Sequence, residues 1–155
     1  MRVAARGTIE APREQVWAVI SDPTRYCQFL DGATMWQVAQ HPGSGDCRST
    51  GLGARWRIRM KVGSAQVGGD VEVVEYDEPG DLAWNSVTGV TMRGRWRLRE
   101  RTPGRTEVTT RLAYQAPGGL IGLIVDRVAA LLVSRSLDRS VRNLQALVEG
   151  RELPA

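Results

Sequence analysis

Two segments of this chain place an apolar residue between arginines at every second position. Residues 55–61 have the sequence RWRIRMK, and residues 93–99 have the sequence RGRWRLR. Side chains of a β-strand point to opposite faces with period two, so each segment has one basic face and one apolar face. Burying unpaired guanidinium groups would be prohibitively costly. The pattern therefore predicts two strands of an antiparallel sheet with the apolar face covered and the basic face outside.

The charges also predict how the first of these strands pairs with the next. If Gly63-Ser64 is a two-residue hairpin loop, Arg57 lies opposite Asp70 on one face and Trp56 opposite Val71 on the other. Both faces agree on this register. The same register gives two further pairs, Arg55 with Glu72 and Met60 with Val67.

A second hairpin follows from the second alternating segment. With residues 102–104 as a three-residue loop, Arg99 pairs with Glu107 on the outside, and on the inside Leu98 meets Val108 and Trp96 meets Thr110. A slip of one residue would bury the arginines. Residues 77–81 and 88–89 have turn composition, so six or seven antiparallel strands are expected.

The first forty residues predict a strand, two short helices and another strand. Residues 3–9 form the strand, and residues 11–20 form a helix with Pro12 near its start. Residues 23–29 form a second helix, and residues 35–40 a short strand before a glycine-rich connection. The expected buried side of the helices consists of Trp17, Ile20, Tyr26 and Leu30.

The last long segment, residues 120–149, has apolar residues at helical spacing and ends at Gly150. Thirty helical residues span about 45 Å, enough to cross a curved sheet diagonally. No repeat or linker interrupts the chain, so we expect one domain over residues 1–150 and a tail at 151–155.

The composition indicates the general type of protein but identifies no binding partner. The chain has 155 residues and a net charge of +4, and Lys61 is its single lysine among 21 cationic residues, as expected of a GC-rich genome. The aromatic residues lie on the strand face opposite the arginines, so no nucleic-acid partner is expected. The apolar stretch at 120–133 is broken by Asp126 and Arg127 and is too short to span a bilayer. Without a signal-peptide pattern, we expect a cytoplasmic protein.

The order of elements resembles the helix-grip fold of START-related and plant-pollen-allergen-like proteins. Residues 9–23, followed by Tyr26 and Phe29, are similar to the opening of these proteins, and residues 94–98 with 106–109 to their late hairpin. Residues 144–149 resemble the end of their long helix. The chain is identified as a member of the polyketide cyclase/dehydrase and lipid-transport superfamily. The resemblance implies an α+β fold in which a curved antiparallel sheet wraps around the C-terminal helix.

The resemblance also implies a cavity between the sheet and the helix that takes an apolar or aromatic small molecule. Large planar side chains and one inward hydroxyl, that of Tyr114, suit such a pocket, and Gly94 opposite Trp84 leaves room for the indole. Any single tryptophan is somewhat better explained as part of the core. The predicted lining residues are Trp36, Trp56, Ile58, Met60, Trp84, Trp96, Thr110, Tyr114, Leu123, Val128, Leu131, Leu132 and Arg135.

Catalytic groups are few in this pattern. The polar candidates for the interior are Tyr114, Thr110, Ser86 or Asn85, Glu75 and Arg135. Glu75 either faces the pocket or marks the end of its strand. His41 is the single histidine, and its spacing to Cys27, Asp46 and Cys47 matches no short zinc motif. We expect no metal and no cofactor.

Three functions remain open at this level. The first is binding or transport of a lipid, polyketide or prenyl quinone. The second is an aromatase/cyclase or dehydratase acting on a polyketide. The third is a protein-interaction module with a vestigial cavity. The basic outer face is either solvated or contacts an anionic membrane, and the protein is expected to be a monomer or homodimer.

Overall fold

The computed structural model describes residues 1–39, 50–115 and 122–153, with side-chain surroundings in the last helix from residue 127 onward. Seven strands and a long helix account for most of this chain. The elements in order are β1 (Arg2–Ile9), α1 (Arg13–Ile20), η1 (Pro23–Arg25), α2 (Tyr26–Phe29), β2 (Ala33–Val38), β3 (Arg55–Val62), β4 (Ala65–Asp77), β5 (Asp81–Ser86), β6 (Met92–Thr102), β7 (Arg105–Tyr114) and α3 (Gly122–Glu149).

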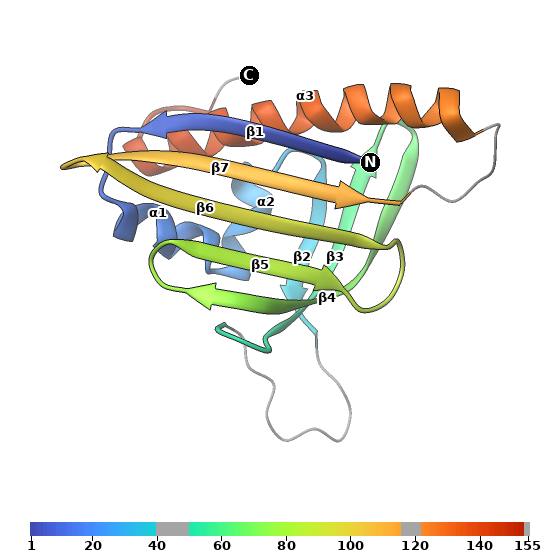
Figure 1. The fold of residues 1–155 in the computed structure, drawn as a ribbon, viewed down its shortest axis with the longest axis horizontal. Helices are drawn as coiled ribbons and strands as arrows, with labels where there is room; N and C mark the ends of the chain where they lie inside the picture. Colours follow the sequence, from blue (N-terminus) through green and yellow to red (C-terminus); the bar gives the residue numbers. More distant parts are fainter. Residues whose placement is uncertain (40–49, 116–121, 154–155) are drawn as a thin grey trace.

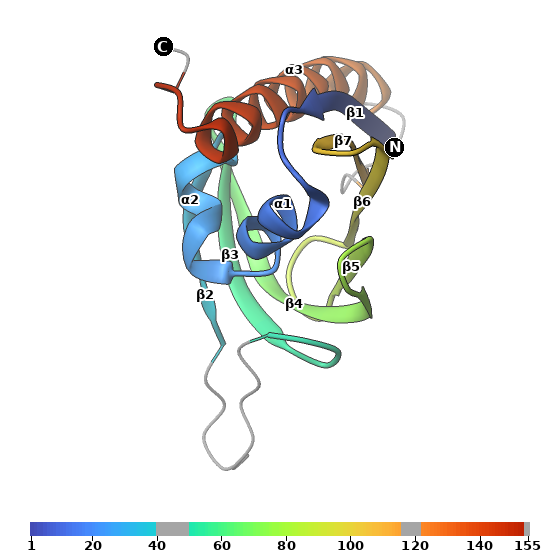
Figure 2. The same ribbon diagram turned by 90° about the vertical axis from the view of Figure 1, so that its left-hand side faces the viewer.

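The strands form one antiparallel sheet in the order β1-β7-β6-β5-β4-β3-β2. The sheet curls, and α3 lies across its open side next to β1 (Figure 1). Viewed from the side that Figure 2 shows, α1 and α2 lie at one end of the curled sheet, beneath α3. This arrangement confirms the predicted helix-grip fold, with seven strands and two short helices after the first strand.

The first hairpin has the predicted register. Arg57 lies opposite Asp70, Trp56 opposite Val71 and Val62 opposite Ala65, which leaves Gly63-Ser64 as the loop. Gly63 has a φ of +58°, the left-handed conformation that such short loops need. Trp56 and Ile58 are buried, while Arg57 and Arg59 are exposed, so the basic face is on the outside.

The second hairpin differs from prediction at its tip. Leu98 faces Val108 and Trp96 faces Thr110 as predicted, but Thr102 pairs with Arg105, so the loop has two residues, not three. The extra residue is a bulge between Glu100 and Thr102, which the alternation does not reveal. Another bulge lies between Val73 and Glu75 in β4.

The bulge in β4 corrects the interpretation of Glu75. One extra residue reverses which face the following side chains take, so Glu75 neither faces the pocket nor ends the strand. Its carboxylate lies 2.5 Å from the guanidinium of Arg95 on the outer face. The interior therefore loses the one carboxylate that the sequence had offered it.

The rotation of α3 is set by polar contacts on its flanks. The Ser136 hydroxyl donates a hydrogen bond to the Asp31 carboxylate at 2.8 Å, and Arg139 donates a second at 2.8 Å. On the other flank Gln145 donates to the carbonyl of Thr8. With these contacts made, Val141, like Val133, Leu137 and Leu144, is buried against the sheet side.

The predicted inward face of α3 is wrong for its N-terminal half. Leu131 is 52% exposed, Val128 57% and Leu132 41%, and Arg135 is also exposed. At 100° per residue, Leu131 and Val128 point about 120° and 180° away from Leu137. The helix carries a second apolar stripe with the same spacing, and sequence periodicity cannot tell which stripe meets the sheet. Leu123 lies outside the described side chains.

Replacing Gly94 by alanine should destabilise the fold. A Cβ atom at Gly94 would overlap the indole of Trp84, which is packed against β6. We expect a loss of about 1–3 kcal/mol in the free energy of unfolding, the usual cost of overpacking a core. Urea denaturation of Gly94→Ala measures it.

Gly80→Ala is the matched control. Its Cβ would lie 3.2 Å from Nη1 of Arg99, the end of a flexible side chain that can move. We expect a change below about 1 kcal/mol there. Equal losses of unfolding free energy in the two variants would show that overlap with Trp84 is not what makes Gly94 necessary.

Candidate functional site

One end of the sheet's concave face is filled by an aromatic cluster. The ring of Trp36 stacks on Tyr26 with centroids 4.3 Å apart and meets the edge of Trp84 at 6.1 Å. Trp56 contacts both Tyr26 and Trp36, and Trp96 packs against Phe29 of α2. The four tryptophans predicted to line a pocket are thus brought together, and here they are packed against the side chains of α2.

Two indole groups in this region lack a hydrogen-bond acceptor. Nε1 of Trp36 and Nε1 of Trp17 are buried and have no partner among the described residues. A buried donor without an acceptor costs about 1–3 kcal/mol, so such groups in a folded protein need an explanation. A ligand oxygen would supply the missing acceptor for Trp36.

Tyr26 supplies a buried hydroxyl that the sequence did not assign to the site. The phenol donates a hydrogen bond of 2.5 Å to the carbonyl of Ile20, at the end of α1. Burial raises the pKa of Tyr26 far above its ordinary value, and the Trp96 side chain opposes this only in part. The hydroxyl therefore stays protonated and links α1 to α2 inside the core.

The other end of the concave face is apolar but incompletely covered. Met60, Val90, Leu112 and Tyr114 pack against the main core while remaining partly exposed. Val62, together with Leu112 and Tyr114, also packs against a second buried cluster that includes Val133 and Leu137 of α3. This end lies under the N-terminal half of α3 (Figure 1). We call these five residues, Met60, Val62, Val90, Leu112 and Tyr114, the apolar mouth.

Tyr114 has its ring in the apolar mouth and its hydroxyl at the strand end. The hydroxyl donates to Sδ of Met1 at 3.4 Å, and the backbone N–H of Tyr114 donates to the carbonyl of Met1. Thr110, on the same strand face and deeper in the sheet, is buried. Both residues are on the predicted face, and the hydroxyl of Tyr114 lies where the interior meets the surface.

Other predicted groups are not assembled into a site. Ser86 accepts a hydrogen bond from the backbone of Met92 at 3.0 Å, and Asn85 is exposed on the outer face. Cys27 is exposed, and His41, Asp46 and Cys47 lie outside the described residues. Within the described chain, no three His, Cys, Asp or Glu side chains are grouped so as to hold a metal ion.

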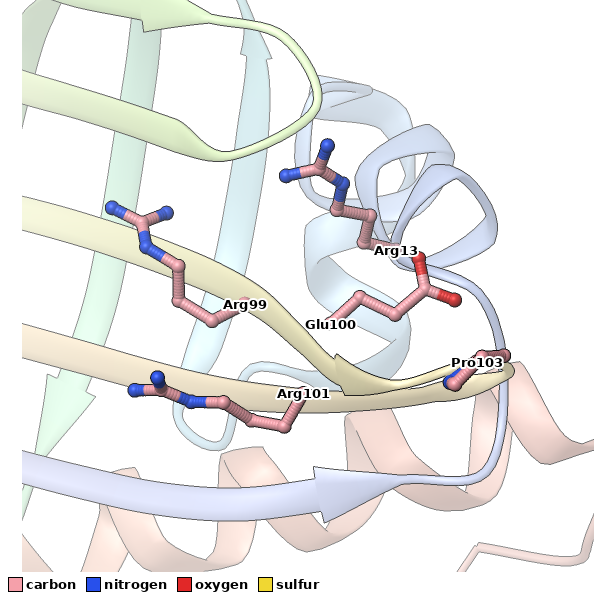
Figure 3. A pocket seen from close by; sticks show the side chains of 5 residues that line it. All are labelled: Arg13, Arg99, Glu100, Arg101 and Pro103. Carbon is pink, nitrogen blue, oxygen red and sulfur yellow. The ribbon is translucent and has the colours of Figure 1, made fainter.

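Two hollows on the outer surface are lined mainly by charged side chains. One, of about 470 Å³, lies between α1 and the tip of β6 and is lined by Arg13, Arg99, Glu100, Arg101 and Pro103 (Figure 3). The other, of about 180 Å³, lies on the convex face of the sheet. Neither has the apolar lining expected of the predicted pocket.

Comparison with known proteins shows to which protein family the chain belongs. The sequence matches the family described as polyketide cyclase/dehydrase and lipid transport over residues 1–149, so the chain belongs to that family. No curated protein matches. None of the described helices is long and apolar enough to cross a membrane.

Solved structures share the fold at low sequence identity. A protein from Thermus thermophilus has 20% identity and a TM-score of 0.79, with 97% of this chain and 98% of that chain covered. A START superfamily protein from Mycobacterium smegmatis has 14% identity and a TM-score of 0.73, with 96% and 97% covered. An aromatase/cyclase from Streptomyces sp. R1128 has 19% identity and a TM-score of 0.68, with 97% and 92% covered. At these identities the likeness establishes the fold.

The buried Tyr26 phenol should make stability sensitive to alkaline pH. The unfolded chain loses this proton above a pKa of about 10, whereas the folded protein keeps it. Stability from this group is therefore fully present below pH 10 and declines as the pH rises beyond it. Urea denaturation between pH 9 and pH 11 should show this decline.

Tyr26→Phe isolates the contribution. The variant lacks the hydrogen bond to Ile20 and should lose about 1–3 kcal/mol at pH 8. Its stability should then fall less than that of the unaltered protein between pH 9 and pH 11. Identical alkaline declines in both proteins would show that Tyr26 ionises in the folded state.

Proposed function

We propose that this protein binds one hydrophobic or aromatic small molecule inside the sheet, entering at the apolar mouth. The observation that best supports this proposal is the contrast between the two ends of the concave face. One end is closed by α1, α2 and the aromatic cluster, and the other presents inward side chains such as Leu112 that remain partly exposed. Partly exposed apolar side chains on a concave face are typical of a ligand site.

The lining favours a planar or flexible apolar molecule that carries an oxygen atom. Met60 and Leu112 offer adaptable apolar contacts, and the indoles of Trp84 and Trp36 lie deeper. Two donors suit an oxygen: the hydroxyl of Tyr114 at the mouth and Nε1 of Trp36 inside, which needs an acceptor. A lipid, a polyketide or a prenyl quinone has this chemistry, and family membership supports the same class of ligand.

A polyketide aromatase/cyclase is the second candidate. It is supported by the family description and by the aromatase/cyclase among the structural neighbours. The interior counts against acid–base chemistry of the usual kind, because the buried carboxylates of the described residues, Asp70 and Asp81, accept from arginines on the outer face. Cyclisation here would rest on hydroxyl groups and on the shape of the cavity. A cytoplasmic location and a monomeric or dimeric state stay predictions.

Filling the apolar mouth should block binding. Leu112→Trp adds an indole at the mouth, whereas Leu131→Trp places the same indole on the exposed face of α3. We expect Leu112→Trp to weaken binding of the neutral fluorescent probe N-phenyl-1-naphthylamine at least tenfold, about 1.4 kcal/mol. Leu131→Trp should bind as the unaltered protein does. Equal affinities for all three proteins would place the probe elsewhere.

Tyr114→Phe tests the polar contact. We expect the variant to bind 1-naphthol about 0.5–1.5 kcal/mol more weakly, the value of one neutral hydrogen bond, and to bind naphthalene unchanged. The difference between the two ligands removes any effect of altered packing. Equal losses for naphthol and naphthalene would remove the hydroxyl from the site.

Turnover separates the two candidate functions. A poly-β-keto substrate mimic, followed by product analysis, should be bound and returned unchanged if the protein only binds. If Tyr114 donates a proton in a cyclase, Tyr114→Phe should lower turnover roughly a hundredfold with affinity nearly unchanged. Cyclised product from the unaltered protein would decide for the enzyme.

A further inference from the structure

The convex face of β1, β7 and β6 holds a hollow of about 180 Å³ lined almost entirely by arginines. Thr109 and Glu107 of β7 complete the lining. This hollow lies on the opposite face of the sheet from the apolar mouth and plays no part in binding there. Its six arginines are Arg6, Arg95, Arg97, Arg99, Arg101 and Arg111.

The pairing of the strands places like charges against each other in this hollow. Arg95 of β6 lies directly opposite Arg111 of β7. In the neighbouring row, Arg6 of β1 and Arg97 of β6 flank Thr109 of β7 from its two sides. Like charges directly opposite on adjacent strands destabilise a sheet. The sheet therefore keeps a locally unfavourable arrangement of charges. Such a conflict between local interactions and the overall fold is typical of functional sites.

The carboxylates nearby are too few to neutralise the arginines. Arg97 and Arg99 share the single carboxylate of Asp81, at 3.1 and 3.0 Å. Arg95 pairs with Glu75, and Arg101 lies 3.8 Å from Glu107. Within the described part of the chain, no ion pair is formed by Arg6 or Arg111.

The bulge near the tip of β6 contributes to the cluster. The extra residue, between Glu100 and Thr102, is Arg101 itself. Figure 3 shows the side chains of Arg99 and Arg101 extending in the same direction from the strand. Six guanidinium groups thus meet three carboxylates around one hollow, with the Thr109 side chain among them.

We propose that this arginine hollow binds a phosphate-bearing anion. Planar guanidinium groups form paired hydrogen bonds with phosphate oxygens, and the hydroxyl of Thr109 adds a neutral donor. The volume admits a group of the size of a phosphate or diphosphate and not a whole drug-sized molecule. The bound anion relieves the repulsion between Arg95 and Arg111.

Thermal unfolding with sodium pyrophosphate tests the site. Binding to the folded state should raise Tm with the logarithm of the pyrophosphate concentration above the dissociation constant, by roughly 5–10 °C at a hundredfold excess. Sodium chloride at the same ionic strength is the reference. Pyrophosphate that does no more than sodium chloride would overturn the proposal.

Arg111→Gln is the diagnostic variant. Without pyrophosphate its Tm should equal or exceed that of the unaltered protein, because the repulsion with Arg95 is gone. Its affinity for pyrophosphate should be at least tenfold lower than that of the unaltered protein. Arg59→Gln is the matched control, an exposed arginine on β3, at the far side of the same sheet. It should respond as the unaltered protein does. A response to pyrophosphate that both variants keep, or both lose, would overturn the proposal.

Vesicles distinguish the source of the phosphate group. We expect vesicles of phosphatidylcholine with about one third phosphatidylglycerol to sediment the protein in competition with pyrophosphate if the anion is a lipid headgroup. Saturable binding of pyrophosphate without sedimentation assigns a soluble phosphate compound, and supports the site equally. Sedimentation that pyrophosphate cannot compete away, and that Arg111→Gln retains, would show diffuse attraction to the membrane and contradict a defined site.

Discussion

The cost of burying a guanidinium group is the constraint on which this structure depends. Arginines alternate with apolar residues on β3 and β6, so only one face of each strand can turn inward. That choice places Trp56, Ile58, Trp96 and Leu98 in the core and sets the pairing along both hairpins. The ion pairs themselves add little, because exposed pairs contribute about 0–1 kcal/mol each. The arginines select the register, and the buried apolar faces stabilise it.

The concave face produced in this way has two ends that differ in how tightly they are packed. At one end Tyr26 and Phe29 of α2 pack against the tryptophans of the sheet, and Trp17 of α1 packs against Tyr76 of β4. Aromatic contacts of this kind each add about 0.5–1.5 kcal/mol beyond burial. At the other end the strands continue beyond this packing and present Met60 and Leu112 beneath α3. The aromatic contacts are thus concentrated at the closed end, and the proposed ligand site is the less tightly packed apolar mouth.

Much of the fold could be predicted because the signal is local. Period-two alternation, turn residues and opposite charges predicted the pairing in both hairpins, and the expected position of Gly94 opposite Trp84 is also confirmed. The bulges in β4 and β6 could not be predicted, because inserting one residue leaves no mark in the composition. For this reason both predictions for Glu75, that it faces the pocket or that it ends the strand, are wrong. Its partner Arg95 is 20 residues away in the chain.

The candidate site was harder to predict, because it depends on contacts between distant segments. The N-terminal half of α3 has two apolar stripes, and the stripe with Leu131 and Val128 is exposed. Asp31 decides the rotation of the helix through Ser136, which is 105 residues away. Tyr26 was expected to be buried, but the acceptor of its hydroxyl, the carbonyl of Ile20, is a backbone group that no sequence pattern marks.

The two faces of the sheet have opposite chemistry, and the central claim concerns the inner one: the apolar mouth retains a small apolar molecule. Native mass spectrometry of the protein purified gently from its own host tests this most directly. The account predicts a mass above that of the polypeptide by one small molecule, which is released on denaturation and partitions into organic solvent. A preparation with the mass of the polypeptide alone, which also takes up no lipid, polyketide or quinone from added mixtures, would contradict it.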